Sequence, residues 1–478
     1  MGKTINVDSS LSQYFNTVVK TGKPTVGIIV GKTTKTKDYV VNLIQSPSKD
    51  GTFEINETWI ASHATNISPM LPSGISIIGI YVVHDAKSVD VQTTRKVVYA
   101  IHKNIQRTRS RYGLNIALED SLHYTTLHVD ISNGRTLSCK QYDVLDNSCS
   151  AKPADWRYGA SPTRWSLLQT QVSLDKQFYV DTMGTMMQQL KTLLSDFCCD
   201  ITNGLMTMNG EIRNNEEVLD PDPPSGGKGK KSKNSLPTKS GKIFKCQLYL
   251  PIKDSDDATE IDASRHKCRV GVCGSITAWA YMPSKTSVQE AIQMLKSDVA
   301  QTLHHRYELL KADLEDQNTK LNSTMDILLP KRLQFKKSET DNFVYSDYLS
   351  KGESIPDVVD RIRELFNSDI DPRLIDSDFE KFPEVITPEV EIVEELVPEP
   401  SVDEVGVGLI DECSSSEDEE CSSHDEQVEL VKESETPEFV DETKVPNNPV
   451  ASSTFKGYIA AGAAVIVGFV MSYWSIQE

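Results

Sequence analysis

The sequence predicts a mixed α/β protein, with a disordered acidic linker and a single transmembrane helix after the folded part. Three observations predict this: short β-branched runs that alternate with segments of helical spacing, a long acidic stretch, and an uncharged run near the end. With 478 residues, the chain has room for two or three domains. Its 38% hydrophobic and 25% charged residues exclude a wholly disordered or collagenous protein.

Residues 1–150 are predicted to form an α/β domain. Short β-branched runs bounded by Gly, Pro, Ser or Asp indicate buried strands, and apolar residues on one face predict a helix over Val89–Tyr112. Within Tyr124–Tyr142, the dipeptide Asn133-Gly134 is a strong hairpin signal. The predicted strands before the helix are Thr25–Val30, Tyr39–Ile44 and Ile75–Val83.

Residues 151–345 are predicted to form a second α/β segment, interrupted by a flexible loop at 220–242 that is rich in Pro, Gly, Ser and Lys. Helical spacing predicts a helix over Asp181–Cys199. The predicted strands are Trp165–Val180, Ile243–Leu250 and Cys268–Met282; in the last of these, Ile276, Ala278 and Ala280 share one face, and Thr277, Trp279 and Tyr281 share the other.

A long helix is predicted from Ser287, where Ser287 and Glu290 have the spacing of a capping box. Its apolar residues recur every three or four positions, so we expect the helix to pack on a sheet rather than to form a partner-binding coiled coil. The stripe consists of Val288, Ile292, Leu295, Val299, Leu303, Tyr307, Leu310 and Leu314.

After a short helical segment predicted at 346–383, residues 384–456 are predicted to form an acidic, disordered tether. Glu384–Asn447 contains 22 acidic and two basic residues, so its net charge is −20. Because the whole chain has a net charge of −19, the remaining residues together have a net charge of +1. The folded part therefore lacks the basic footprint of a nucleic-acid-binding protein. Within the tether, Ser414, Ser415 and Ser416 each precede an acidic residue by three positions, which suits phosphorylation by an acidophilic kinase.

Residues 457–474 (GYIAAGAAVIVGFVMSYW) carry no charge and predict a transmembrane tail anchor. A helix of this length is about 27 Å long, close to the thickness of the endoplasmic reticulum bilayer core. The alternative, a buried core helix, would require the chain to return to a core after the acidic stretch. The residues predicted to contact the membrane are Gly457, Tyr458, Ile459, Val465, Ile466, Val467, Phe469, Val470, Tyr473 and Trp474.

A spanning helix so near the C-terminus is expected to insert after synthesis, which would keep the N-terminal body in the cytosol. Lys456 then lies on the cytosolic side and Glu478 on the far side, in agreement with the positive-inside tendency. The last four residues, Ser475–Glu478, contain no basic residue. This favours the endoplasmic reticulum membrane over the mitochondrial outer membrane.

The common catalytic signatures are missing: the sequence has no Walker loop, Rossmann fingerprint, HExxH or GxSxG motif. Its nine cysteines are odd in number and include no CxxC pair, which argues against a disulfide framework and against a zinc ribbon. His304 and His305 are neighbours on the long helix, and we expect both to be exposed. No Cys–His nucleophile pair can be assembled from the sequence, and no cofactor is predicted.

One strand resembles a known metal motif. Gly79-Ile80-Tyr81-Val82-Val83-His84 is similar to the strand of MPN-domain isopeptidases that reads Gly-aromatic-Tyr-His-Ser-His, in which both histidines bind zinc. Val82 stands at the first ligand position, His84 at the second, and Arg95 near the position of a third ligand, an aspartate. A catalytic zinc needs three protein ligands. The resemblance to this motif, carried by Gly79, Tyr81, Val82 and His84, therefore implies an MPN-like fold over 1–150 without metal and without activity.

The layout of the whole chain resembles the odr-four family. The resemblance is carried by MGKTINVD at the start, VGIIVGK, PSGISIIGIYVV, CGSITAWAYMPS with the long helix after it, LPKRL near Leu329, and the C-terminal anchor. It implies an inactive MPN-type protein of the endoplasmic reticulum membrane that assists maturation or trafficking of seven-helix receptors. It also implies binding and recruitment of the UFM-one-specific cysteine protease.

Two hypotheses follow from the sequence. The first is a non-enzymatic, tail-anchored adaptor, in which a cytosolic body connected to the anchor by the acidic tether holds a partner at the membrane. The second is an active metallo-isopeptidase of the MPN type whose ligands are rearranged in the sequence. A tail-anchored membrane-fusion protein fits poorly, because no sustained heptad repeat precedes the anchor.

Overall fold

The structure is a computed structural model that describes residues 3–48, 53–85, 91–111, 122–146, 148–159, 165–181, 185–221, 241–251, 266–316, 325–339 and 341–382. All of these residues belong to one compact unit, Met1–Val390. The predicted tether, the three serines at 414–416 and the predicted anchor at 457–474 lie outside the described residues, as does most of the loop at 220–242. Within the described part of the chain, no helix is both long enough and apolar enough to cross a membrane.

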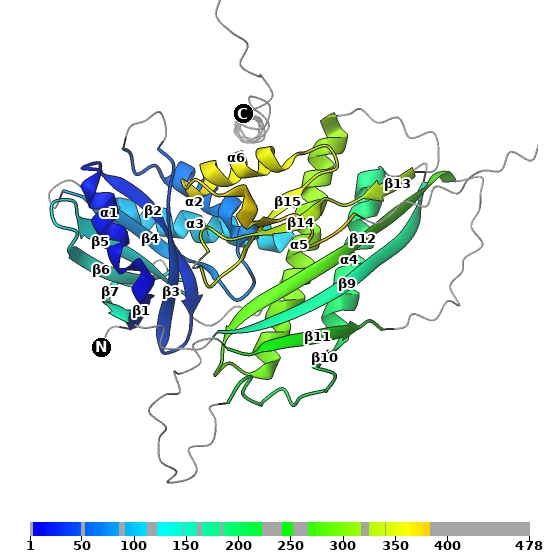
Figure 1. Ribbon diagram of the computed structural model, residues 1–478, viewed down its shortest axis with the longest axis horizontal. Coiled ribbons are helices and arrows are strands. Elements are labelled where there is room, and N and C mark those ends of the chain that lie inside the picture. Colours follow the sequence, from blue (N-terminus) through cyan, green and yellow to red (C-terminus); the bar gives the residue numbers. More distant parts are fainter. Residues whose placement is uncertain are drawn as a thin grey trace, which may run out of the picture. The chain divides into compact units, whose positions relative to one another are not determined.

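An eight-stranded mixed sheet is built from the N-terminal residues, in the order β7-β6-β5-β4-β2-β3-β1-β8 (Figure 1). It confirms the three predicted strands and the hairpin around Asn133-Gly134, and helix α3 (Val91–Arg111) confirms the helix predicted between them. The strands are β1 (Thr4–Asp8), β2 (Thr25–Thr33), β3 (Lys37–Gln45), β4 (Ser76–His84), β5 (His123–Asp130), β6 (Thr136–Asp143), β7 (Lys152–Pro153) and β8 (Asp155–Gly159).

Short helices that the sequence analysis did not identify complete this part of the fold. Helix α2 (Glu57–Ile67) packs beside α3, and its first turn is capped by Asn56, whose side chain accepts a hydrogen bond from the Trp59 backbone N–H. The other face of the sheet packs against the 3-10 helix η1 (Ser9–Gln13) and helix α1 (Tyr14–Lys20). A further 3-10 turn, η3 (Ser68–Met70), follows α2.

A five-stranded sheet follows in the order β10-β11-β9-β12-β13. Its two longest strands, β9 and β12, run antiparallel side by side (Figure 1). The strands confirm those predicted in this segment, and α5 confirms the long helix from Ser287. The elements are β9 (Trp165–Asp181), α4 (Met186–Asn203), β10 (Leu205–Met208), β11 (Ile243–Tyr249), β12 (His266–Pro283), α5 (Val288–Asp316) and β13 (Met325–Leu328).

Helix α4 begins five residues later than predicted, because β9 continues to Asp181 opposite β12. The helix starts instead after Thr185, which forms a capping box with Gln188. A capping box satisfies two backbone N–H groups of the first turn and so fixes where a helix begins. Residues 346–383, which the sequence predicts as a short helical segment, contain helix α6 (Ile355–Phe366), the 3-10 turn η6 (Pro372–Leu374) and strand segments.

These strand segments belong to a third, three-stranded sheet in the order β15-β14-β16. Its strands are β14 (Lys331–Phe335), β15 (Tyr345–Leu349) and β16 (Ile375–Asp376). Two hydrogen bonds, one buried and one partly buried, join this last part of the body to the first. Asn42 Nδ2 donates to Tyr345 Oη at 2.6 Å, and His63 Nε2 donates to the Leu365 carbonyl at 2.7 Å.

Strand β12 joins two hydrophobic cores. Ile276, Ala278 and Ala280 are buried in one core (core 2) between the five-stranded sheet and helices α4 and α5. On the opposite face, Trp279 and Tyr281 belong to another core (core 1), which also contains residues of β2, β4, α2, α3, β14, β15 and α6. The predicted alternation of this strand is therefore confirmed. Core 1 draws residues from both sides of positions 150 and 345, the predicted domain boundaries.

One edge of β12 is closed by side chains instead of a strand. Strand β13 pairs only with Val270–Cys273, so the backbone groups from Ser275 onward on that edge need other partners. The Glu380 carboxylate accepts from the Thr277 N–H at 2.5 Å, and the Asp298 carboxylate accepts from the Trp279 N–H at 3.0 Å. The two carboxylates thus take the place of a neighbouring strand.

Two buried arginines neutralise these carboxylates. Arg306 donates to both oxygens of Glu380, at 2.9 and 2.8 Å, and Arg332 donates to Asp298 at 2.6 Å. The Arg332 guanidinium also lies 3.8 Å from the centre of the Trp279 ring. All four charged side chains are at most 4% exposed. Since buried charges are tolerated only when they are paired and hydrogen-bonded, the four residues depend on one another.

We predict that Glu380→Ala lowers the free energy of unfolding by about 3–5 kcal/mol, because it leaves the Arg306 guanidinium buried without a counter-charge. Chemical denaturation followed by tryptophan fluorescence measures this loss. Glu216→Ala is the matched control: Glu216 is exposed, and its replacement should change stability by less than about 0.5 kcal/mol. Equal effects of the two substitutions would contradict the role assigned to Glu380.

Candidate functional site

The candidate site lies at the C-terminal end of β4, the strand whose sequence resembles the metal motif. Strands β4 and β5 are parallel neighbours, and α3 is the crossover between them. In open α/β sheets, ligands commonly bind outside the carboxyl ends of such strands. His84 is the last residue of β4, and the first turns of α3 follow it in the chain.

The motif residues are used to pack β4 into the middle of the sheet. A Cβ atom at Gly79 would lie 2.0 Å from the Thr125 carbonyl oxygen of β5, so only glycine fits there. Tyr81 is fully buried, and its hydroxyl lies 2.5 Å from that of Tyr14 on α1. Val82 is also fully buried, in core 1. At the first ligand position, the structure therefore places an aliphatic side chain among other apolar groups.

His84 makes a contact that the sequence did not reveal: its Nε2 lies 3.0 Å from Nδ1 of His128 on β5. His84 Nδ1 lies 2.7 Å from the Asp85 carbonyl oxygen, which can only accept, so Nδ1 carries the proton. His84 Nε2 must then accept from the Nδ1–H of His128. Both imidazoles are nearly fully buried, at 3% and 4% exposed. The pair is a hydrogen-bonded link between two strands.

Arg95, near the third ligand position of the motif, also makes structural contacts. Arg95 lies on α3, where its guanidinium packs over the rings of Tyr99 and Tyr142 and donates to the Cys149 carbonyl oxygen. Throughout the described ranges, no group of three or more His, Cys, Asp or Glu side chains is placed to hold a metal ion. The lone pair of His84 Nε2, which a metal would need, already accepts the proton of His128.

A Cys–His pair also exists, between residues that sequence reasoning could not connect. Cys198 Sγ on α4 lies 3.5 Å from His304 Nε2 on α5, and both side chains are buried. Burial raises the pKa of the Cys198 thiol to about 12, so the thiol stays protonated at neutral pH. A nucleophilic cysteine needs the opposite, a lowered pKa and access to substrate. The contact therefore packs α4 against α5.

The sequence prediction that His304 and His305 are exposed is wrong. His304 is 2% exposed, and His305 packs against the Tyr348 ring. Burial, together with the nearby Arg332, Arg361 and Arg306, lowers the pKa of His305 to about 4. Neither residue could be placed from the helix pattern, because the surface that covers this side of α5 comes from α4 and from the third sheet.

The pair His84–His128 predicts a pH dependence of stability. Burial, followed by the charges of His84 and Lys140, lowers the pKa of His128 from 6.5 to about 4. Between these two values, the unfolded chain takes up a proton at His128 while the folded chain does not, so stability falls as the pH falls. His63 and His305 act in the same direction, whereas Asp347, whose pKa is raised to about 6 chiefly by burial, acts in the opposite one.

We therefore predict that His128→Asn reduces the slope of unfolding free energy against pH between about pH 6.5 and 4. The asparagine amide can still donate to His84 Nε2, so the link between the strands is kept while the titrating group is removed. Urea unfolding of the wild type and the variant at several pH values gives the two slopes. Identical slopes would show that His128 is not protonated on unfolding.

Comparison with known proteins places the fold and these residues in context. The family described as Odorant response abnormal 4-like matches residues 27–377. "Protein odr-4 homolog" of Homo sapiens is 26% identical over 393 residues, which cover 77% of this chain and 84% of that protein. "Odorant response abnormal protein 4" of Caenorhabditis elegans is 20% identical over 350 residues, which cover 70% and 68% of the two chains.

One solved structure, UfSP from C. elegans, aligns with 77% of this chain and 57% of its own, at 10% identity and a TM-score of 0.39. A likeness at this score supports no conclusion about function. The family match is different in kind, because it extends through all three sheets and includes both β4 and the long helix α5. On that match, the chain belongs to the Odorant response abnormal 4-like family.

Proposed function

We propose that the protein is a non-enzymatic adaptor of the endoplasmic reticulum membrane. It binds and recruits a UFM-one-specific cysteine protease, and it assists the maturation or trafficking of seven-helix (odorant) receptors. The family match over residues 27–377 carries this proposal, because the relatives in the match are named for the odorant response. The resemblance of the whole chain to that family extends the proposal to the protease and to the membrane.

The absence of enzymatic activity is supported by the residues of β4. In this proposal, residues 1–150 have an MPN-like fold in which the catalytic positions have become structural. Val82 is buried among apolar residues, and the His84 lone pair is used by His128. Both imidazoles are nearly inaccessible to solvent, so neither can activate a water molecule for attack on a conjugate.

Attachment to the membrane is proposed through residues 457–474, which the acidic tether, residues 384–456, connects to the folded body. A flexible chain of about seventy residues has an r.m.s. span of roughly 42–50 Å, and repulsion between like charges extends it further. A body confined within this distance of a bilayer meets membrane-bound receptors at a high effective concentration. The adaptor would work by this confinement, without chemistry of its own.

The membrane proposal predicts that the full-length protein, expressed in cells, stays in the membrane pellet after alkaline carbonate extraction. A chain that ends at residue 456 should move to the soluble fraction, because it loses every apolar residue of the anchor. Immunoblotting of the two fractions measures the difference. Release of the full-length protein by carbonate would contradict the proposed anchor.

Recruitment is tested by purification from a detergent extract of cells, with and without residues 457–478. We expect the UFM-one-specific protease to be retained by both forms, since removal of residues 457–478 leaves the folded body unchanged. Seven-helix receptors should be enriched only with the anchored form. Failure of both forms to retain the protease would refute recruitment, and stoichiometric zinc with turnover of ubiquitin-like conjugates would refute the non-enzymatic role.

A further inference from the structure

Helix α3 carries an unbalanced positive charge. Its 21 residues include six Lys or Arg and no Asp or Glu. The two exposed residues Lys103 and Arg107 are four positions apart, a like-charge spacing that destabilises a helix by a few tenths of a kcal/mol. This concentration is unusual for the protein, because the chain outside Glu384–Asn447 has a net charge of only +1.

Three of these six cationic residues are set aside, because two have contacts of their own and one is at the end of the helix. Arg95 stacks on two tyrosine rings, and Arg109 is largely buried, so that desolvation lowers the pKa of its guanidinium. Arg111 is the last residue of the helix. The remaining three, Lys96, Lys103 and Arg107, are exposed, and none of them forms an ion pair with any residue that the structure describes.

Lys96, Lys103 and Arg107 lie on one face of α3, and we call them the basic stripe. Lys103 is seven positions after Lys96, and Arg107 is four positions after Lys103. At 100° per residue, all three side chains therefore lie within about 20° of one line along the helix. At 1.5 Å per residue, the stripe is about 16 Å long. A segment of about five residues in extended conformation spans the same length, at about 3.3 Å per residue.

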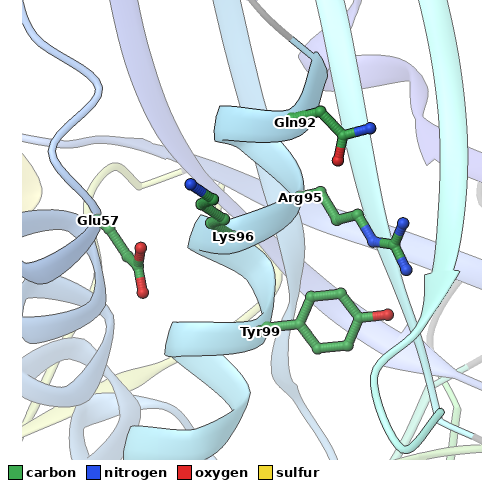
Figure 2. A pocket seen from close by; sticks show the side chains of 5 residues that line it. All are labelled: Glu57, Gln92, Arg95, Lys96 and Tyr99. Atoms are coloured by element: carbon green, nitrogen blue, oxygen red, sulfur yellow. The ribbon is translucent and has the colours of Figure 1, made fainter. Parts of the chain in front are cut away.

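A shallow hollow marks one end of the basic stripe (Figure 2). It is an open depression of about 350 Å³ lined by Glu57 of α2 and by Gln92, Arg95, Lys96 and Tyr99 of α3. Figure 2 shows Lys96 on the side of α3 that faces Glu57. The hollow combines a lysine, an arginine and a glutamate with amide and aromatic groups, which suits a polar side chain or a backbone group of a bound peptide better than an apolar one.

We propose that the basic stripe of α3 is a docking surface for an acidic segment of a partner protein, bound in extended form with its carboxylates along Lys96, Lys103 and Arg107. Charge complementarity is the argument for this occupant. Lys103 and Arg107 are about 6 Å apart along the helix, close to the roughly 6.6 Å between carboxylates on alternate residues of an extended chain, and Lys96 lies about 10.5 Å further along the same line. This surface is additional to the proposed recruitment of the protease and does not depend on it.

Two other anionic occupants fit the stripe less well. A bilayer surface is broad and flat, whereas the stripe is one residue wide and ends beside the Glu57 carboxylate. Single-stranded nucleic acid is usually bound on exposed aromatic platforms between basic residues, but Tyr99 is half-buried under Arg95. The stripe therefore favours a narrow, flexible acidic chain.

The test uses the full-length protein in non-ionic detergent and a fluorescein-labelled peptide of ten glutamates as the probe. Fluorescence anisotropy at an ionic strength of about 0.1 M should show saturable binding. Lys103→Glu with Arg107→Glu should raise the Kd at least tenfold, because two attractive contacts become repulsive. The matched control, Lys35→Glu with Lys37→Glu, makes the same change of charge at two exposed lysines, one in the β2–β3 turn and one at the start of β3, and should alter the Kd less than twofold.

Several outcomes would overturn the proposal. Equal binding by the wild type and the stripe variant would do so, as would an equal loss in the control. Stronger binding to phosphatidylserine vesicles or to a uridine decamer, lost in the same variant, would assign the stripe to lipid or to RNA. If circular dichroism shows that the double glutamate variant is misfolded, Lys103→Gln with Arg107→Gln replaces it, and unchanged affinity in that variant would again refute the proposal.

Discussion

The open edge of β12 is the constraint on which the rest of the body depends. A long strand that outruns its neighbour leaves backbone N–H groups that must find partners once they are buried. Here the partners are the carboxylates of Asp298 and Glu380, and these in turn require Arg332 and Arg306. Glu380 is among the last described residues, and Arg306 lies on α5. Their ion pair therefore connects the C-terminal end of the described body to α5 and β12.

The same strand explains why the three sheets form one compact unit. One face of β12 contributes Ile276, Ala278 and Ala280 to core 2. The other face contributes Trp279 and Tyr281 to core 1, which also contains residues of the first and third sheets. A substitution at this junction would disturb both cores at once.

The candidate site shows how buried titratable side chains are used as structural contacts. A buried histidine is costly when charged, and the imidazoles of His84 on β4 and His128 on β5 are both buried and hydrogen-bonded to each other. Cys198 and His304 illustrate the same principle at the interface of α4 and α5. Burial lowers the pKa of His128 and raises that of the Cys198 thiol, in each case away from the value that catalysis would require.

The sequence by itself determined the mixed α/β class, most of the long strands, helices α3 and α5, and the alternation of β12, because hydrophobic periodicity is a local property of the chain. It also identified the family. Only the tertiary structure decided that His84 meets His128, that Cys198 meets His304, and that Glu380 closes an edge formed about a hundred residues earlier. Such contacts join residues whose spacing carries no pattern, so they are set by how the sheets and helices pack, not by any single segment.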